Sequence, residues 1–288
     1  RQYLPGMKAR NWVARLSVFA AAVGISFCFA GRGGGFDLGF ADGTPLACVD
    51  CHNPGQGKKY SHYPATSGDC QVCHTALPEH SFAPGPGSVT TEQTAETCYQ
   101  CHERKDAGPV LHQALASGAQ CTNCHDPHAA DHPQFLKSKA PEMCIGCHTD
   151  VHSSDAATTH SPVVDGKACL NCHTPHSGQH PNLLVANKNE LCFQCHTAPI
   201  NRKKGPPSGQ IPSIKHQLEN SRYLHQPFTE EGNCTTACHV PHSAEETFLL
   251  SKHYPSNTYT TKSGRNDETY GLCFQCHSTD LLNKNLKN

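Results

Sequence analysis

Nine short cysteine motifs constrain this sequence more than any other feature. Eighteen of its 19 cysteines form nine pairs, and a histidine directly follows the second cysteine of each pair. In chain order, motifs one to nine are Cys48/Cys51/His52, Cys70/Cys73/His74, Cys98/Cys101/His102, Cys121/Cys124/His125, Cys144/Cys147/His148, Cys169/Cys172/His173, Cys192/Cys195/His196, Cys234/Cys238/His239 and Cys273/Cys276/His277. Two residues separate the cysteines in eight motifs, and three separate them in motif eight.

The spacing matches the chemistry of covalent c-type haem attachment. On one helical turn, residues i, i+3 and i+4 share a face, so both thiols can bond the porphyrin edge while the histidine reaches the iron. A zinc site would need two such half-sites per metal and gives no reason for a histidine after every pair. A disulfide framework leaves the nine histidines equally unexplained. The sequence therefore predicts nine covalently attached haems.

The composition is too polar for one large protein core. Hydrophobic residues make up 36% of the chain, mean hydropathy is -0.55, and Gly and Pro together supply 44 of 288 residues. Nine porphyrins would supply the missing apolar mass, at one haem for about 29 residues of a mature chain. The expected fold is mostly irregular with short α-helices, little or no β-sheet and an elongated chain of closely packed haems. Residues 141–143 and 189–191 are expected to open short helices, and the long spacers 197–233 and 243–272 to form surface loops.

The N-terminus has the layout of a secretory leader. A basic region containing Lys8, Arg10 and Arg15 precedes an apolar run over residues 16–30, too short for a confident membrane anchor. We expect Met7 as the true start and cleavage after Ala30 or Ala41, with the remaining cysteine, Cys28, removed. The expected organisation is a leader over 1–30, a mature N-terminal segment over 31–47, a haem region of tandem repeats over 48–277 and a tail over 278–288. Export to the periplasm follows, because c-type haems are attached outside the bacterial cytoplasm.

The mature chain is acidic. The leader holds four basic residues and no acidic ones, which leaves 19 basic and 24 acidic residues, a net charge of -5. Such a surface repels nucleic acid and favours docking with a basic redox partner. The one basic cluster, residues 202–204, is interpreted as a solvated loop.

The segments between motifs repeat. Motifs four, six and eight each continue as His-x-Pro-His, and a histidine stands nine residues before each first cysteine, at His112, His160 and His225. This shared register predicts that motif eight also binds haem, with its extra residue forming a local bulge.

Thirteen of the 22 histidines remain for the second axial position of each iron. The only methionines are Met7 and Met143, and Met143 adjoins Cys144, so bis-histidine haems of low potential are expected. The distal candidates, taken as ligands of the nearest preceding motif, are His62, His80, His112, His128, His160, His176, His225 and His242. No histidine follows His277, so the ninth haem lacks a local ligand. It could borrow one of His132, His152, His180, His216 and His253, with His253 the first choice, could take one from another subunit, or could stay open.

On these motifs and flanking histidines, the chain over residues 48–277 resembles multihaem cytochromes with the doubled CXXCH motif, and within them the periplasmic decahaem cytochromes of metal- and sulfoxide-respiring bacteria (MtrA/DmsE type). The resemblance implies a haem-stacked wire that accepts electrons from an inner-membrane quinol-linked cytochrome. It passes them to a terminal reductase or, through an outer-membrane porin or cytochrome, to the cell exterior. This sequence differs in having nine motifs, a stretched motif eight and no histidine after motif nine.

Three functions follow as hypotheses. The first is a non-enzymatic electron carrier in anaerobic respiration or extracellular electron transfer, with no membrane span after leader removal. The second is a multihaem reductase of nitrogen or sulfur oxyanions at an open ninth haem. The third is a subunit of a polymerising extracellular filament, in which a histidine crosses the subunit boundary.

Overall fold

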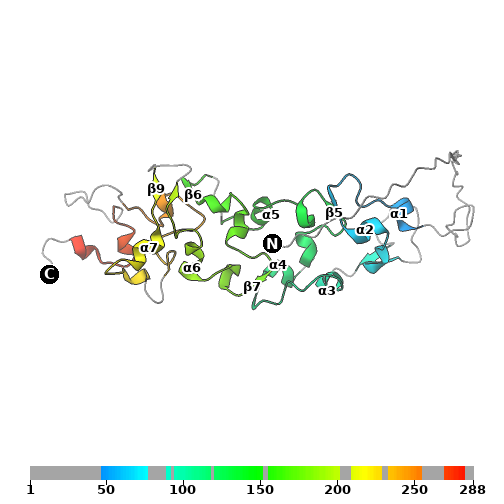
Figure 1. Cartoon of the computed structure of the whole chain (residues 1–288), viewed down its shortest axis with the longest axis horizontal. Helices are drawn as coiled ribbons and strands as arrows, with labels where there is room; N and C mark the ends of the chain where they lie inside the picture. The colour runs from blue at the N-terminus through cyan, green and yellow to red at the C-terminus, as the bar shows by residue number, and fades with distance from the viewer. Residues whose placement is uncertain are drawn as a thin grey trace, which may run out of the picture. The chain divides into compact units, whose positions relative to one another are not determined.

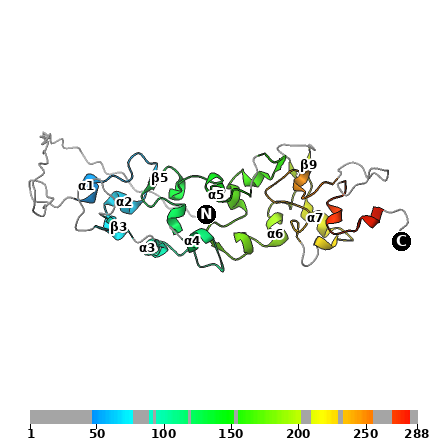
Figure 2. The ribbon, with the colours of Figure 1, turned by 180° about the vertical axis from the view of Figure 1, so that it is seen from behind.

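The computed structural model describes residues 47–76, 89–91, 94–117, 120–151, 155–201, 209–228, 233–254 and 269–282. The expected leader, its cleavage sites, Cys28, His80, His152, the basic cluster at 202–204 and most of the C-terminal tail lie outside these residues. The chain divides into Arg1–Leu46 and Ala47–Asn288, and everything described belongs to the second unit. In Figures 1 and 2, α1 lies toward one end of this unit and the C-terminal segment drawn in red toward the other, and β5 lies close to α2.

The helices are short, as the frequent prolines and glycines predict. The α-helices are α1 (Cys48–Cys51), α2 (Tyr63–Ser67), α3 (Ala95–Tyr99), α4 (Gln113–Ala116), α5 (Glu142–Ile145), α6 (Lys188–Phe193) and α7 (Ile214–Glu219). The 3-10 helices are η1 (Cys70–Val72), η2 (Gln120–Asn123), η3 (Pro133–Phe135), η4 (Ser161–Val163), η5 (Ala168–Asn171), η6 (Pro181–Leu183), η7 (Gln226–Phe228), η8 (Thr247–Leu249), η9 (Cys273–Gln275) and η10 (Thr279–Leu282). Helices α5 and α6 lead into motifs five and seven where the sequence predicts them.

The sheet content is small and local. The strands are β1 (Tyr60–Ser61), β2 (His74–Ala76), β3 (Val89–Thr91), β4 (Val110–Leu111), β5 (Ala129–Ala130), β6 (Thr158–Thr159), β7 (Ser177–Gly178), β8 (Ile200–Asn201), β9 (Gln210–Ile211) and β10 (Ser243–Ala244). They pair antiparallel in twos: β1 with β5, β2 with β3, β4 with β7, β6 with β10 and β8 with β9. The expected fold class, mostly irregular with short helices and very little sheet, is confirmed.

Three of these pairs recur once per repeat, and we call them the first, second and third ladder: β1/β5, β4/β7 and β6/β10. In each, a two-residue strand directly before a spare histidine pairs with the two residues after a Pro-His dipeptide, in the registers Tyr60↔Ala130, Val110↔Gly178 and Thr159↔Ser243. The ladders join segments that lie far apart in sequence, so they determine the tertiary arrangement of the repeats.

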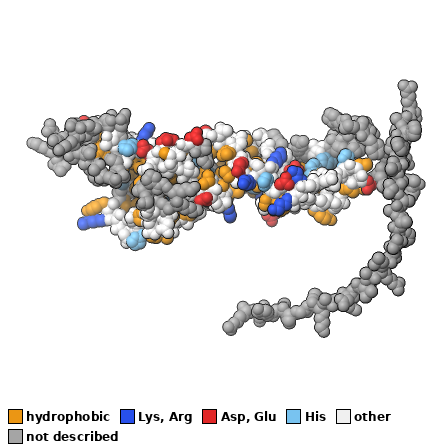
Figure 3. All heavy atoms as spheres, turned by 90° about the horizontal axis from the view of Figure 1, so that it is seen from above, with side chains coloured by type: hydrophobic (Ala, Val, Ile, Leu, Met, Phe, Trp, Pro, Cys, Tyr) orange, Lys and Arg blue, Asp and Glu red, His pale blue; other side chains and the backbone are white. Residues whose placement is uncertain are grey.

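Very little of the described chain forms a protein core. The buried apolar residues are Ala129, Ala130, Ala168 and Tyr270, and no large side chain is fully buried among the described residues. Figure 3 shows hydrophobic, acidic and imidazole side chains mixed over the described surface on one face. A chain of this composition leaves space for large apolar groups other than its own side chains.

The long spacers contain more structure than the expected surface loops. Residues 197–233 include β8, β9, α7 and η7, and residues 243–272 include β10 and η8. Helix α7 begins after Ser213, whose hydroxyl oxygen accepts a hydrogen bond from the backbone N–H of His216. Because this N-cap satisfies a free donor at the helix start, a polar segment without an apolar stripe still forms a helix.

Candidate haem-binding sites

Eight motifs are closed by the same backbone hydrogen bond, whereas in motif two the N–H of Cys73 donates to the carbonyl of Cys70 (3.1 Å). In these eight, the N–H of the motif histidine donates to the carbonyl of the first cysteine, as in His125 to Cys121 (3.0 Å) and His277 to Cys273 (3.0 Å). In motif eight the same bond runs from His239 to Cys234 (3.1 Å) across one more residue. This is the expected bulge: a wider turn absorbs the extra residue and keeps the cysteine-to-histidine geometry.

The thiols of consecutive motifs adjoin one another along the whole described unit. All 18 described cysteines are free thiols. Hydrogen bonds join the first cysteines of motifs one and two, three and four, five and six, and seven and eight. These pairs are Cys48–Cys70, Cys98–Cys121, Cys144–Cys169 and Cys192–Cys234. In the remaining steps the charge of a cysteine in the adjacent motif raises the pKa of the other thiol, as Cys73 does for Cys98, Cys147 for Cys124, Cys195 for Cys172 and Cys276 for Cys238. Eight steps thus connect nine motifs in chain order.

The surroundings of these thiols change their acidity. Burial, reinforced by the neighbouring cysteine, raises the pKa of Cys98 to about 11 and that of Cys144 to about 11. The hydrogen bond between Cys192 and Cys234 raises the pKa of Cys192 and lowers that of Cys234 to about 7. The alternation of directly bonded and more distant thiols indicates two kinds of contact between neighbouring motifs.

The motifs also differ in exposure. The second cysteines of the even motifs are half-buried, whereas those of the odd motifs are exposed: Cys51, Cys101, Cys147, Cys195 and Cys276. The even motifs are covered because the following chain returns over them. Strand β2 leaves motif two and pairs with β3, and the histidines of motifs four, six and eight bridge to Leu136, Leu184 and Leu250.

Seven motif histidines face a spare histidine within the part of the chain described. Their ring planes lie within 14–29° of parallel. The pairs and centroid distances are His74–His128 (5.6 Å), His102–His62 (5.9 Å), His125–His176 (6.1 Å), His148–His112 (6.0 Å), His173–His242 (6.2 Å), His196–His160 (6.3 Å) and His277–His225 (5.9 Å).

The geometry of the His74–His128 pair fits two axial ligands of one metal. Its Nε2 atoms lie 3.4 Å apart, closer than the ring centroids at 5.6 Å, so the rings meet at their Nε2 tips. Metal–imidazole bonds are about 2 Å long, so two ligands on opposite sides of an ion hold their nitrogens about 4 Å apart. The paired rings are therefore spaced for an iron between them.

The other ring nitrogen, Nδ1, is held by backbone carbonyls. Among motif histidines, Nδ1 contacts the carbonyl oxygen of Gln134 from His125 (2.7 Å), of Asn182 from His173 (2.8 Å) and of Phe248 from His239 (3.0 Å). Among spare histidines, it contacts the oxygen of Pro127 from His62 (2.8 Å) and of Pro241 from His160 (3.0 Å). A carbonyl accepting from Nδ1–H leaves Nε2 free for a metal and fixes the ring orientation.

The carbonyls that face the motif histidines come from strained backbone. Gln134, Asn182 and Phe248 each adopt a left-handed φ, of 55°, 56° and 59°, and each stands nine residues after its motif histidine. Left-handed non-glycine residues cost free energy and occur where the surrounding structure requires them. These acceptors were not predicted from the sequence, although the constant spacing of nine residues from each motif histidine could have indicated them.

Burial keeps many of the paired imidazoles neutral. It lowers the pKa of His74, His112, His160, His176 and His196. Only the neutral ring can offer a lone pair to a metal. The buried Nδ1 of His196 has no hydrogen-bond partner among the described residues, unlike the Nδ1 atoms of His125, His173 and His239.

The ring pairs differ from the local assignment made on the sequence. Each histidine that precedes an even motif faces a later motif: His62 faces motif three, His112 motif five, His160 motif seven and His225 motif nine. Each Pro-His histidine faces an earlier one: His128 faces motif two, His176 motif four and His242 motif six. Each ladder brings one histidine of either kind side by side, and the two point to different motifs.

This reassignment separates His52 of motif one from its predicted ligand. His62, the local candidate, faces His102 instead, because the first ladder directs it toward motif three. His52 is itself exposed, and its backbone N–H keeps the motif bond to the carbonyl of Cys48 at 2.8 Å. The structure thus preserves the local geometry of motif one but contradicts the predicted pairing of His52 with His62.

Cys101, the second cysteine of motif three, is exposed. The pKa of the first cysteine, Cys98, responds instead to thiols of both neighbouring motifs, Cys121 and Cys73.

The histidine opposite motif nine is His225 and not His253. The Nδ1 of His253 lies 3.1 Å from a carboxylate oxygen of Glu246. His132 and His180 precede η3 and η6, and His216 lies in α7. His80, the remaining distal candidate, lies outside the described residues. Among the described residues, no imidazole ring is paired with that of His239 in motif eight.

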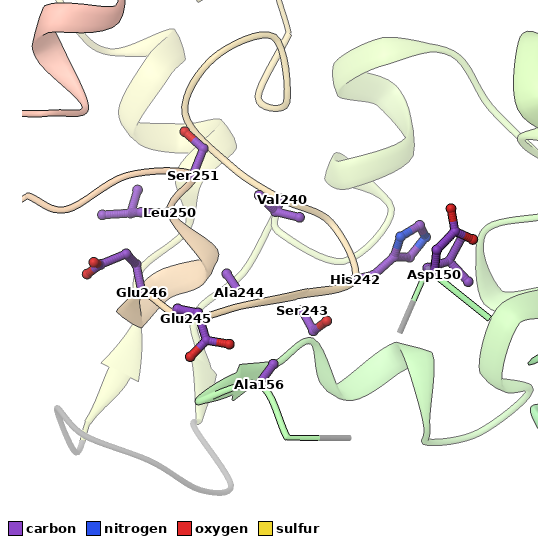
Figure 4. A pocket seen from close by; sticks show the side chains of 11 residues that line it. Asp150, Ala156, Val240, His242, Ser243, Ala244, Glu245, Glu246, Leu250 and Ser251 are labelled. Carbon is purple, nitrogen blue, oxygen red and sulfur yellow. The ribbon is translucent and has the colours of Figure 1, made fainter. Parts of the chain in front are cut away.

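A cavity of about 550 Å³ lies beside the third ladder. Its lining includes His242, Asp150, Val240 and Leu250, and Figure 4 shows the imidazole of His242 beside Asp150. This volume is within the range of small-molecule and cofactor sites, and the ring that faces motif six projects at its edge.

Comparison with known families agrees with this arrangement. Residues 112–153, 160–200 and 225–281 match the family described as doubled CXXCH motif. Residues 55–126 match the family described as cytochrome c7 and related cytochrome c. No curated protein matches the sequence. Among the described residues, no helix is long and apolar enough to span a membrane.

Proposed function

Because the chain belongs to the multihaem c-type cytochromes, which are electron-transfer proteins, we propose that it carries nine covalent haems and conducts electrons along them in motif order. The observation that carries the proposal is the succession of thiols in motif order, in which four pairs of motifs are joined by a thiol hydrogen bond and the four steps between them are linked by the electrostatic effect of one thiol on the pKa of the next. A c-type haem is bonded to these sulfurs at one edge, so adjoining thiols bring neighbouring porphyrin edges together.

The protein's own residues supply attachment, ligation and orientation. When bound, each haem accepts and releases one electron by cycling between ferric and ferrous iron. The paired imidazoles hold the iron from both sides, and the carbonyls on Nδ1 increase the basicity of these ligands. Two histidine ligands without a thioether favour low reduction potentials.

The cellular role is also a proposal. We assign export to the periplasm from the basic and apolar character of residues 1–30. The acidic mature chain suits a donor and an acceptor with basic docking faces. By resemblance to the MtrA/DmsE type, the donor is an inner-membrane quinol-linked cytochrome, and the acceptor is a terminal reductase or an outer-membrane porin or cytochrome. The process is anaerobic respiration or extracellular electron transfer.

The reductase hypothesis loses its original basis, an open ninth haem, because His225 faces His277 at 5.9 Å between ring centroids. We therefore retain the electron carrier as the function that the geometry supports best.

The test is the haem count and redox behaviour of the exported protein. Intact-mass spectrometry is expected to give nine haems, and potentiometric titration several overlapping low potentials. Deletion of Ala237, which restores two residues between the cysteines of motif eight, should leave the count at nine. Eight haems in the natural chain and nine after the deletion would show that motif eight does not load.

A second measurement addresses conduction. Reduction by a low-potential donor should reach all haems in one fast phase. Isolated groups of haems that reduce in separate, slow phases would contradict a continuous chain of haems in motif order.

A further inference from the structure

Motif two holds its histidine differently from the other eight motifs. Within the described chain it lacks the backbone hydrogen bond from the motif histidine to the first cysteine, and its turn is closed instead from Cys73 to Cys70 (3.1 Å). His74 is the first residue of β2, and its Cα partner in the antiparallel pair with β3 is Thr91. A neighbouring strand therefore positions this histidine, whereas a turn does so in the other motifs.

The Nδ1 of the same histidine faces a side chain and not the backbone. It lies 2.5 Å from the hydroxyl oxygen of Thr91, which stands 17 residues later in the chain. In motifs four, six and eight the Nδ1 atoms of His125, His173 and His239 lie 2.7, 2.8 and 3.0 Å from backbone carbonyl oxygens nine residues later. A point substitution removes a hydroxyl but not a backbone carbonyl, so motif two offers an acceptor that can be tested directly.

The direction of this hydrogen bond follows from the opposite face of the ring. The Nε2 of His74 lies 3.4 Å from that of His128, and the two ring planes are 14° from parallel, so both Nε2 atoms point to the place of one metal. An imidazole whose Nε2 lone pair binds a metal carries its proton on Nδ1. The His74 Nδ1–H therefore donates, and the oxygen of Thr91 accepts.

An acceptor on Nδ1–H changes both the orientation and the donor strength of an axial imidazole. It fixes the ring plane and moves electron density into the ring, which makes Nε2 a stronger donor to the iron and favours the ferric state. Hydrogen bonding around the ligands is one of the means by which a protein sets the potential of a haem. Threonine is suited to this role because branching at Cβ restricts the rotation of its side chain.

We propose that Thr91 is the positioning residue of the haem of motif two. Its hydroxyl accepts from His74 Nδ1–H, holds the ring toward the iron and lowers the reduction potential of this haem. The potential at motif two thus depends on one side chain, whereas backbone carbonyls have the same part at motifs four, six and eight. This inference rests on the proposed attachment of haem to motif two and on its ligation by His74 and His128.

The experiment compares two substitutions at position 91 in the full-length holoprotein by potentiometric titration. Thr91→Val keeps the branched shape but removes the hydroxyl, and it should shift the potential of one haem in nine upward. Thr91→Ser restores the hydroxyl on a smaller side chain and should return the titration to that of the natural protein. Intact-mass spectrometry should give the same haem count for all three proteins, which separates the shift from a loss of haem.

Two further proteins identify the haem and control for the loss of a hydroxyl. With Cys70→Ser and Cys73→Ser, which prevent attachment at motif two, Thr91→Val should no longer shift any potential. Thr66→Val is the matched control, because the Thr66 hydroxyl donates to the carbonyl of Tyr63 (3.0 Å) inside α2 and not to a ring nitrogen. Its titration should equal that of the natural protein.

Three results would overturn the inference. An unchanged or lowered potential in Thr91→Val means that the hydroxyl does not strengthen the ligand. An equal upward shift in Thr91→Ser or in Thr66→Val makes packing, and not the hydrogen bond, the cause. A shift that persists without the haem of motif two assigns the effect to another haem. A natural protein in which Cys70 and Cys73 carry no haem, in contrast, contradicts the proposed function itself.

Discussion

The imidazole of His225 faces that of His277 with 5.9 Å between the ring centroids and 15° between the ring planes. The two residues belong to different repeats, and motif eight lies between them in the sequence. His225 thus faces the motif two places after motif seven, which precedes it in the sequence. His62, His112 and His160 likewise each face the motif two places after the one that precedes them. The ring pairs bring seven motif histidines next to segments that lie far away in the sequence. With the proposed haems bound between these rings, axial ligation would also hold the tertiary structure together.

Crossed pairing predicts which haem responds to a lost ligand. His225→Ala should add one high-spin haem, detected by electron paramagnetic resonance. The addition should disappear when Cys273→Ser and Cys276→Ser prevent attachment at motif nine, and should persist when Cys192→Ser and Cys195→Ser remove motif seven. A double-mutant comparison of this kind identifies the coupled partner. The reverse result would restore local pairing with motif seven.

The carbonyl of Asn182, which faces His173, should affect the reduction potential of the haem that His173 binds. Asn182 has φ 56° and its oxygen lies 2.8 Å from His173 Nδ1. Proline cannot adopt a positive φ, so Asn182→Pro should displace the carbonyl and raise the reduction potential of one haem, because the imidazole becomes a weaker electron donor. Potentiometric titration measures the shift. Asn182→Gly, which keeps both the conformation and the carbonyl, is the control, and an equal shift there would argue against this cause.

The second ladder depends on a close backbone approach. A Cβ on Gly108 would lie 2.8 Å from the backbone nitrogen of Gly178 and 3.0 Å from its oxygen. Gly108→Ala should therefore push β4 from β7 and destabilise the fold by about 1–3 kcal/mol. Thermal unfolding and the loss of low-spin signal from the haems of His125 and His148 report the effect.

Gly146→Ala is the matched control for this substitution. A Cβ there would meet only carbonyl oxygens at 3.5 and 3.7 Å, so its unfolding midpoint should stay close to that of the natural protein. Equal destabilisation by both substitutions would contradict a specific role for the β4–β7 approach.

The first ladder carries a pH-dependent ion pair. Lys58 Nζ lies 2.8 Å from Asp131 Oδ2, and this hydrogen bond lowers the pKa of Asp131. Its contribution to stability is therefore present above the unfolded pKa of about 4 and is lost as the pH falls through the lower folded value. Lys58→Met should slightly lower the unfolding midpoint at neutral pH and have no effect in strong acid. Lys167→Met is the control, because Lys167 precedes η5, outside the first ladder, and its loss should not show this pH dependence.

Much of the local architecture was predictable. The motif spacing indicated covalent attachment, the register of His225 and Pro241-His242 indicated a bulge in motif eight, and the polar composition excluded a large core. Helices α5 and α6 lie where Glu142 and Glu190 suggested them. The ladders were not predictable, because strands of two residues such as Thr158–Thr159 have no detectable periodicity.

The sequence alone determined the motifs, the supply of thiols and imidazoles, and the repeat, because these depend on residue identity and spacing over a few turns of chain. Only the tertiary structure decided which imidazoles face each other. That choice depends on backbone hydrogen bonds between segments such as His160 and His242, which are 82 residues apart by subtraction of their numbers. Antiparallel pairing places His225 opposite motif nine, and the ring pairs among the described residues include neither motif one nor motif eight, because the pairing directs each spare histidine two motifs away from the motif that precedes it.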